Sequence, residues 1–285
     1  MIANNKVLDC ILDTNHVSWE SGNISSDFLE LASEQRLNII KNLAKNKLNI
    51  SKLADIIDAT KPEIHRNVTR LTKAGLIEKN IDGDYGLSVY GNAVLVQIPS
   101  LTFFTENKQF FKNHTLGNLE DKFIQRIGAL ENKKHVKGYV KTLEKWRQIQ
   151  ENAEKYIYNI LSEVPYSGDI IEVISKQLKN DLHIRSVFSD KVIVPEDRKK
   201  IFEERDFQKY VKSGNLERKI KKNVTVVVLV TDKESAVFFP NIEGTTDLSE
   251  MFYSSNAKFR EWCYDYFTWC WDNGTSFQES KISGI

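Results

Sequence analysis

The sequence has almost no net charge and few of the residues that mark special architectures. Its 40 lysines and arginines are balanced by 39 aspartates and glutamates, so the formal net charge is only +1 over 285 residues. This balance excludes a global positive field that would attract nucleic acid, and any such site must be local. With 41% hydrophobic and 11% aromatic residues, the chain has the composition of a folded globular protein.

Cysteine is scarce as well. Cys10, Cys263 and Cys270 contain no Cys-x-x-Cys pair, which excludes a disulfide-rich scaffold and the common zinc and redox motifs. The first residues, MIANNKVLDC, lack the basic region, apolar run and small-residue cleavage site of a secretory signal. We therefore expect a protein of the reducing cytoplasm, with no metal and no cofactor.

One stretch lacks charge and yet is not typical of a membrane span. Residues 85–105 contain no charged side chain over 21 positions, which is long enough to cross a bilayer. Glycine, asparagine, glutamine, proline and serine interrupt this stretch, and it begins with the alternating pattern of a strand. The pattern therefore predicts a buried strand followed by a helix.

Changes of pattern define the predicted domains, because the chain shows no internal repeat. We expect an N-terminal arm over 1–25, a winged helix-turn-helix over 26–90, a helical connector over 91–160, an α/β domain over 161–275 and a tail over 276–285. The expected fold class is thus an α+β winged helix-turn-helix, joined by helices to a C-terminal α/β domain.

Residues 26–60 predict the first two helices of the winged helix-turn-helix. An apolar stripe from Phe28 to Ala44 predicts a single helix that ends near Asn46. A short helix over 52–57 is expected to follow, with Ser51 as its N-cap. Asp58 and Ala59 then form a tight turn.

The third helix has the strongest local signal. Thr60 and Glu63 have the spacing of a capping box, with Pro62 in the first turn, and Gly75 supplies a stop. These signals predict a helix over 61–74. The Asp82-Gly83 pair predicts a turn between extended runs at 76–79 and 85–89, which form the wing.

This helix has a cationic outer face. Because Ile64, Val68 and Leu71 define the buried face at about 100° per residue, Arg66 and Lys73 lie opposite the core. Residues 61–79 contain five cations and two anions, a local charge of +3. The candidate DNA-binding residues are Lys61, Pro62, His65, Arg66, Thr69, Arg70 and Lys73 on the helix, and Lys79 and Tyr85 on the wing.

Arginine suits bidentate contacts with guanine, whereas lysine acts on phosphate as a point charge. We therefore assign Arg66 and Arg70 mainly to bases and Lys73 to the DNA backbone. His65 could contact a base or simply pack against the protein, and the acidic Asp82 and Asp84 weaken the wing as a phosphate contact. A merely solvated cationic surface is the alternative to DNA binding.

The central and C-terminal residues predict helices and then an α/β domain. Apolar residues between 91 and 111 predict a helix kinked at Pro99, which forms either a dimer seam or a contact with the chain's own domain. Extended runs at 182–188, 224–230 and 236–239 predict strands, the second of them central.

A C-terminal helix carries an apolar stripe that predicts core packing, with both cysteines as core thiols. The stripe consists of Phe259, Trp262, Cys263, Tyr266, Phe267 and Cys270.

Two blocks resemble archaeal transcriptional regulators. The first, ISKLADIIDATKPEIHRNVTRLTKAGLIEK, is similar to the winged helix of ArsR-like regulators. The second covers residues 220–273, including FREWCYDYFTWCWDN, and resembles the C-terminal domain of methanogenesis-type regulators; residues 110–114 and 126–130 resemble that family's connecting segment. The resemblance implies a dimeric DNA-binding regulator with a C-terminal sensor or assembly domain. In that domain it marks Phe239, Asp247, Trp262 and Asp265 as candidate ligand-binding residues.

The C-terminal domain also has a distant similarity to the phospholipase-D-like sensor domain of sugar-responsive archaeal regulators. His135-Val136-Lys137 matches the His-x-Lys part of the catalytic signature HxKxxxxD, but Thr142 stands where the aspartate is needed. The sequence also shows no nucleophile with its base and no phosphate-binding glycine loop. We therefore expect a non-enzymatic, sequence-specific DNA-binding regulator that binds double-stranded DNA, forms a homodimer, takes a small-molecule effector and has no membrane contact. The alternative is a winged helix that docks proteins onto an unrecognised C-terminal enzyme.

Overall fold

The computed structural model describes residues 24–163, 168–193 and 198–277. Nearly all of the predicted N-terminal arm, including Cys10, and of the predicted tail lies outside the described residues. The chain divides into two compact units, Met1–Gln97 and Ile98–Ile285. The division falls inside one helix, α6 (Val89–Glu106), rather than at residue 90.

The first unit begins with two helices where the sequence predicted one. α2 (Ile24–Leu31) ends before Ser33, whose side chain accepts a hydrogen bond from Arg36 N and caps α3 (Glu34–Leu43). The buried Arg36 side chain donates to the carbonyl oxygens of Leu29 and Glu30 at 2.7 Å each. The Leu29 carbonyl also accepts from Ala32 N at 3.3 Å. Carbonyls in the last turn of a helix lack the usual i+4 donor, so the Arg36 guanidinium supplies donors there and stabilises the break.

The second helix also starts earlier than predicted. α4 (Ile50–Ile57) is capped by Asn49, whose Oδ1 accepts from Lys52 N at 3.0 Å, and not by Ser51. Ser51 already lies inside the first turn. The left-handed residue Asp58 (φ 55°) ends the helix at the predicted turn.

The third helix and the hairpin follow the prediction closely. α5 (Lys61–Lys73) begins with the expected capping box of Thr60 and Glu63, and Gly75 follows its end at φ +73°. β1 (Ile77–Lys79) pairs antiparallel with β2 (Tyr85–Leu87). A bridge between Leu48 and Tyr85 ties the hairpin to the segment before α4. α3, α4, α5 and the hairpin share one core, which includes Ile39, Leu53, Ile64, Leu71 and Leu76.

Gly91 allows α6 to lie directly on the backbone of the first unit. A Cβ atom at this position would lie 1.9 Å from the carbonyl oxygen of Leu76, a distance that requires the backbone to move. The close approach also places Val94 and Leu95 against the core of this unit.

We therefore expect Gly91→Ala to destabilise the first unit by about 1–3 kcal/mol, the usual cost of overpacking. Chemical denaturation of the full chain followed by circular dichroism measures the loss. Gly75→Ala is a useful comparison, because a Cβ there meets no atom within 4 Å and the strain comes only from the positive φ. Equal stability of Gly91→Ala and the wild type would contradict the close packing.

The second unit is built on one sheet. Among its described residues the strand order is β10-β6-β5-β4-β7-β8-β9-β3. β4, β5 and β6 run parallel, and the other neighbouring pairs are antiparallel. The strands are β3 (Lys134–Lys137), β4 (Tyr156–Glu163), β5 (His183–Ile193), β6 (Leu216–Lys221), β7 (Val227–Thr231), β8 (Ser235–Phe238), β9 (Glu250–Ser254) and β10 (Thr275–Ser276).

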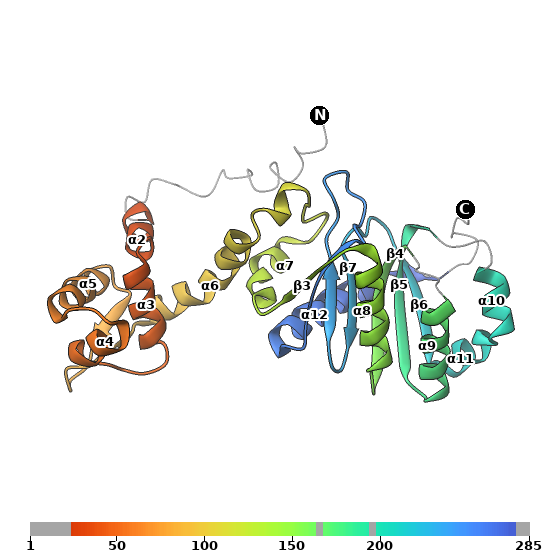
Figure 1. The fold of residues 1–285 in the computed structure, drawn as a ribbon, viewed down its shortest axis with the longest axis horizontal. Helices are drawn as coiled ribbons and strands as arrows, with labels where there is room; N and C mark the ends of the chain where they lie inside the picture. The colour runs from red at the N-terminus through yellow and green to blue at the C-terminus, as the bar shows by residue number, and fades with distance from the viewer. Residues whose placement is uncertain (1–23, 164–167, 194–197, 278–285) are drawn as a thin grey trace. The chain divides into compact units, whose positions relative to one another are not determined.

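Helices cover both faces of this sheet (Figure 1). α12 (Ala257–Asp272) packs on one face with α7 (Asp121–Gln125) and the short 3-10 turns η1 (Phe110–Lys112) and η2 (Ile127–Leu130). α8 (Tyr139–Glu151) and α9 (Gly168–Lys179) pack on the other, next to α10 (Arg198–Glu204) and α11 (Phe207–Ser213). β7 is buried at every position, which confirms the prediction of a central strand.

Residues 98–160 do not form a separate connector. They contribute β3, the start of β4, α8 and several core residues of the second unit, such as Phe103 and Trp146. The predicted helix after residue 91 exists as α6, with Pro99 inside it. Residues 85–105 form β2 and most of α6, the predicted strand and helix, but Val89, Val96 and Leu101 are exposed rather than buried. Among the described residues no helix is long and apolar enough to cross a membrane.

Candidate nucleic-acid interface

The structure places the predicted contact residues of α5 on its exposed face. Lys61, His65, Arg66, Thr69 and Lys73 are all exposed, as is Pro62. Opposite them, Ile64, Val68 and Leu71 are 0–1% exposed, as the periodicity predicted. Within the described residues no ion pair occupies Lys61, Arg66 or Lys73. Their charges are therefore available to an external anion.

Arg70 differs from the other cations of this face. Its Nε and Nη2 atoms donate to both carboxylate oxygens of Glu30 on α2, at distances between 2.7 and 3.2 Å. Glu30 also lies 3.1 Å from Arg36, and its side chain is only 15% exposed. Because one edge of the Arg70 guanidinium, Nε and Nη2, is bound to Glu30, Arg70 holds α2 against α5 in this structure. A base contact through this edge of Arg70, which the sequence assigned to bases, would require the pair with Glu30 to open.

The hydrogen bond from Arg70 lowers the pKa of Glu30, and the nearby charge of Arg36 lowers it further, although burial of the carboxylate acts in the opposite direction. A carboxylate whose pKa is lowered by folding stabilises the protein above its unfolded-state pKa and loses that contribution as the pH falls through the folded value. The pair therefore supports the first unit at neutral pH and not in acid.

We expect Glu30→Gln to lower the stability of the chain at pH 7 and to have a progressively smaller effect below the ordinary glutamate pKa of 4.5. Urea denaturation of variant and wild type at a series of pH values measures the difference. Glu34→Gln, at the start of α3, is the matched control. A pH-independent difference would show that the Glu30 charge has no part in the effect.

The hairpin presents a smaller set of contact residues. Lys79 is exposed and lies 5.7 Å from the centre of the Tyr85 ring, so the two predicted wing residues are neighbours. Asn80 closes the turn by accepting from Asp84 N at 2.8 Å, and Gly83 adopts φ +90°. Ile81 is fully exposed at the tip. Sequence reasoning did not select Ile81, because a lone apolar residue in a turn carries no specific signal.

Two predicted ligand-binding residues of the second unit are core residues instead. Phe239 and Trp262 are 0% exposed, and Trp262 Nε1 donates to Phe123 O at 3.0 Å. Their side chains pack between the sheet and α12 and leave no surface for a ligand. In this structure the aromatic pattern therefore serves the core at these two positions.

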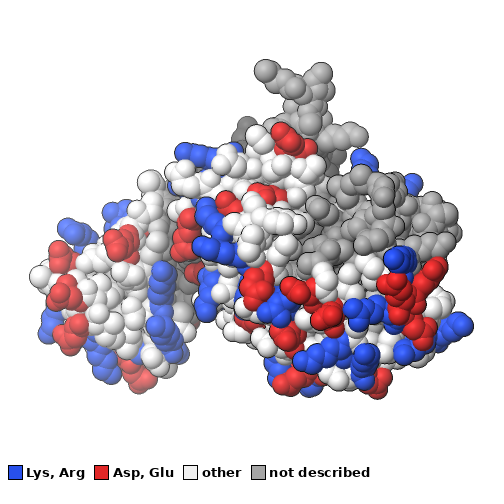
Figure 2. All heavy atoms as spheres, turned by 45° about the vertical axis from the view of Figure 1, so that its right-hand side comes forward, with Lys and Arg blue, Asp and Glu red and all other residues white. Residues whose placement is uncertain are grey.

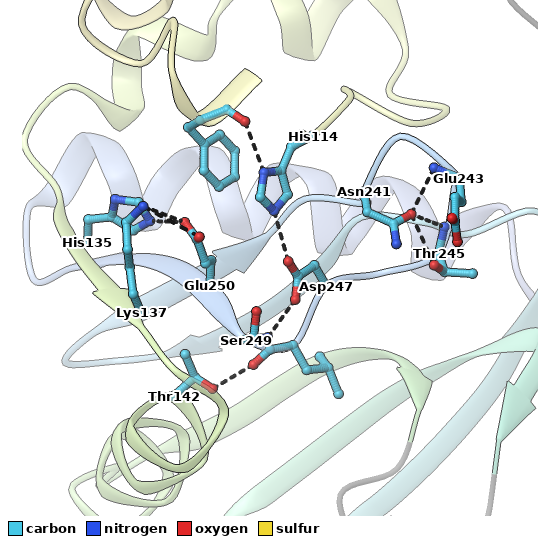
Figure 3. A network of polar contacts seen from close by, with 12 residues as sticks. His114, His135, Lys137, Thr142, Asn241, Glu243, Thr245, Asp247, Ser249 and Glu250 are labelled. Carbon is cyan, nitrogen blue, oxygen red and sulfur yellow. Dashed lines mark hydrogen bonds and ion pairs between the residues drawn. The ribbon is translucent and has the colours of Figure 1, made fainter. Parts of the chain in front are cut away.

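Asp247 belongs to a polar network in the second unit (Figure 3). Its Oδ2 lies 3.1 Å from His114 Nε2, and its Oδ1 accepts from Ser249 N at 2.8 Å. His114 stacks on the Phe110 ring and contacts Phe110 O through Nδ1 at 3.0 Å. Burial raises the pKa of Asp247, but the hydrogen bonds with Ser249 and His114 lower it overall. The carboxylate thus ties the η1 segment to the loop before β9.

The fourth candidate, Asp265, is partly exposed and forms an ion pair with Arg126 at 2.7 Å. This contact joins α12 to the segment between α7 and η2. Asp265 and Asp247 are therefore engaged by different partners, and the structure does not bring the four predicted ligand-binding residues into one site.

The His-x-Lys sequence lies on the edge strand β3. His135 Nε2 and Lys137 Nζ both contact the Glu250 carboxylate, at 2.9 and 3.2 Å (Figure 3). Burial lowers the pKa of His135, although Glu250 raises it. Thr142, at the position of the missing aspartate, donates to Leu248 O at 2.6 Å and acts in the fold.

The cysteines of α12 are core thiols, as predicted. Cys263 and Cys270 are 0% exposed. Burial raises the pKa of Cys263 well above its usual value and that of Cys270 to about 12. Within the described ranges no group of three or more potential metal ligands occurs.

Figure 2 shows acidic and basic side chains interspersed on the visible face of the second unit, without a field of one sign.

Comparisons with known proteins identify the first unit more specifically than the second. Residues 25–108 match the family model described as the HVO_A0261 N-terminal domain, an archaeal family. This segment contains α3, α4, α5, the hairpin and α6. No curated protein matches the chain.

Solved structures align only weakly. TrmBL2, described as an archaeal chromatin protein with a novel mode of DNA binding, is 13% identical, with a TM-score of 0.38 over 85% of this chain and 93% of its own. Nuc from Salmonella typhimurium, a phospholipase D family member, is 12% identical over 52% of this chain and all of its own, with a TM-score of 0.37. NucT from Helicobacter pylori is 10% identical over 51% of this chain and all of its own, with a TM-score of 0.39. Because these TM-scores lie below 0.5, what the comparisons establish is an N-terminal segment similar to the HVO_A0261 family.

Proposed function

We propose that the protein is a sequence-specific DNA-binding transcriptional regulator that uses α5 as its recognition helix. The observation that carries the proposal is the exposed face of α5, where Lys61, Arg66 and Lys73 have no ion-pair partner among the described residues. A helix packed against two others and followed by a hairpin is the arrangement in which a winged helix-turn-helix offers its third helix to the major groove. The resemblance to ArsR-like regulators supports the same assignment.

The distribution of charge favours DNA over a merely solvated surface. The five cations among residues 61–79 lie in a chain whose total charge is +1. Arginine and lysine on one helix face fit the division of labour at a DNA interface, in which arginine contacts bases and lysine contacts phosphates. In this proposal Arg66 is the main base contact, Lys73, Lys61 and Lys79 contact the backbone, and Thr69, His65, Pro62 and Tyr85 line the interface.

We infer a homodimer, formed through the exposed side of α6. Val89 and Val96 are 90% and 71% exposed, and Ala93 lies on the same side of the helix. Such a stripe offers an apolar surface that a second copy would cover, and a twofold axis would give two recognition helices for two half-sites. In this proposal the protein is a cytoplasmic regulator. Its second unit is a sensor or assembly domain and has no enzymatic activity.

Selection of DNA by the purified full chain tests the proposal. Random duplexes are incubated with the protein, bound molecules are amplified, and the rounds are repeated at two salt concentrations. Enrichment of one motif, bound more weakly at higher salt, is the expected result, because phosphate contacts release counterions. Retention of random duplexes without enrichment would exclude sequence-specific recognition. Failure to retain any duplex would favour the alternative, a winged helix that docks proteins.

A further inference from the structure

The face of the sheet that α8 and α9 cover contains a row of polar residues. Asn159 on β4 pairs in register with Ser186 on β5, and Ser186 pairs with Arg218 on β6. Side chains at these registers share one face of the sheet, because alternate residues of a strand point the same way. Three polar residues therefore cross the centre of the parallel part of the sheet side by side.

The rows on both sides of this polar row are apolar. Ile157, Ile184 and Leu216 precede it, and Leu161, Phe188 and Ile220 follow it, all of them in the same buried cluster. A sheet face that needed only to pack against helices would continue this apolar pattern, because burying a polar group without a partner is costly. The polar row thus interrupts a hydrophobic face at the same level on three adjacent strands.

A cavity of about 110 Å³ lies over this row. Besides the three polar residues, it is lined by Gln150 from α8, by isoleucines of α9, and by Phe202 and Phe207. The walls are mostly apolar, and the polar groups are gathered on the floor and at one side. This combination of an apolar cavity with a few convergent polar groups is typical of small-molecule sites.

Two of the polar atoms at the cavity have no hydrogen-bond partner in the protein. They are Gln150 Oε1 and Asn159 Oδ1, and both residues are only 3% exposed. A buried acceptor without a partner is destabilising, because it has lost its hydrogen bonds to water and gained none in the protein. Since both oxygens accept hydrogen bonds, the group that satisfies them must donate an O–H or N–H.

Arg218 adds a positive charge at the end of the row. Its guanidinium lies 4.7 Å from the centre of the Phe202 ring and 4.2 Å from that of Phe277, so aromatic rings hold it at the cavity. A guanidinium held in this way suits a carboxylate, which it binds with a planar fork. The Ser186 hydroxyl, between Arg218 and Asn159, supplies a further donor.

We propose that this cavity is the binding site of a small 2-hydroxy or 2-amino acid. Its carboxylate lies toward Arg218 and Ser186. A 2-amino group donates to both Asn159 Oδ1 and Gln150 Oε1, whereas a 2-hydroxyl, with a single proton, donates to one of them. A dry cavity of about 150 Å³ holds benzene, so 110 Å³ suits a molecule of about five or six non-hydrogen atoms. Lactate, glycolate, glycine and alanine have this size and these groups.

Equilibrium dialysis of the full-length protein with labelled lactate, glycolate, glycine and alanine tests the proposal directly. We expect saturable binding of at least one of them, with one molecule per chain. Propionate lacks the donor of lactate, and 1,2-propanediol lacks its carboxylate. Both are expected to compete at least tenfold more weakly, because propionate cannot donate to the amide oxygens of Asn159 and Gln150 and the diol brings no negative charge to the Arg218 guanidinium. No binding of any of the four at millimolar concentrations, or equal competition by propionate, would overturn the proposal and leave ordered water as the occupant.

Asn159→Leu separates the ligand site from folding. Leucine has a similar shape and removes an unsatisfied oxygen, so the variant is expected to be at least as stable as the wild type and to bind the acid at least tenfold more weakly. Ser235→Ala is the matched control, because Ser235 is a buried, unpartnered hydroxyl on β8 away from the cavity. Gln150→Leu is a second test should Asn159→Leu not fold. Unchanged binding by a folded Asn159→Leu or Gln150→Leu variant would overturn the assignment of these residues.

In the proposed regulator, the bound acid would be the effector that changes DNA affinity. This role rests on the proposed function, whereas binding of the acid to the cavity does not. DNA affinity measured with and without the bound acid tests that role separately. Binding of the acid by a protein that selects no DNA motif would therefore uphold the cavity assignment while rejecting the regulator, and the reverse result would do the opposite.

Discussion

Arg66→Ala is expected to weaken binding to the selected duplex by about 1–3 kcal/mol, or roughly fivefold to 150-fold, and to relax the preference for one base pair. Arg66 is exposed on the face of α5 opposite Ile64 and Leu71, and no ion pair among the described residues holds its guanidinium. It is therefore free to form a bidentate contact with a guanine. Titration of labelled duplex, and of duplexes with single base-pair changes, measures both effects.

Arg70→Ala and Lys73→Ala are the matched comparisons on the same helix. Because Arg70 is held by Glu30, its replacement should affect stability more than base preference. Replacement of Lys73 should weaken all duplexes to a similar extent and reduce the salt dependence, as loss of a phosphate contact does. If Arg66→Ala folds normally and keeps both affinity and sequence preference, Arg66 is not a base contact.

Trp262→Ala is expected to destabilise the second unit by about 3–5 kcal/mol, the range for replacing a buried aromatic residue by alanine. Trp262 is fully buried in α12, stacks near Tyr266 and donates to Phe123 O. Its loss would leave a cavity between α12 and the sheet and an unpaired carbonyl. Urea denaturation followed by circular dichroism measures the change.

Lys258→Ala, an exposed position on the same helix, serves as the control and should stay within about 0.5 kcal/mol of the wild type. A Trp262→Ala protein with wild-type stability would contradict the structural role given to this residue. It would also reopen the interpretation of Trp262 as a ligand contact.

The parts of the fold that the sequence predicted well are those determined by neighbouring residues. The capping box of Thr60 and Glu63, the stop at Gly75 and the stripe of Ile64, Val68 and Leu71 define α5 within a few positions. The hairpin turn and the buried strand β7 are local in the same sense, because a turn pair and a continuous apolar run each specify one structure. The stripe of α12 likewise predicted its buried face.

The parts that were missed depend on side-chain contacts and strand pairings that periodicity along the chain does not show. The break between α2 and α3 is stabilised by Arg36, whose donors reach back to the end of the preceding helix. The Arg70–Glu30 pair joins residues forty positions apart, so helix periodicity alone placed Arg70 on the DNA-binding face. The strands β3, β6, β9 and β10 carry many polar residues and lack the apolar run that identified β7.

The candidate ligand site could not be read from the sequence for the same reason. Asn159, Ser186 and Arg218 come together only through the register of three strands. Ser186 follows Arg185, and Arg218 lies between Glu217 and Lys219, so neither stands out in the sequence from the polar residues around it. Conversely, Phe239 and Trp262 attracted attention as aromatic residues of a recurring motif but serve the core.

Lysine footprinting of the full chain on its selected duplex tests most directly whether α5 and the hairpin contact DNA. Acetylation of free and DNA-bound protein is compared by mass spectrometry, residue by residue. We predict that Lys61, Lys73 and Lys79 lose reactivity on binding, whereas Lys176 and Lys258, exposed on the second unit, keep theirs. Protection of second-unit lysines with Lys61, Lys73 and Lys79 unchanged would contradict the assignment of α5 as the recognition helix.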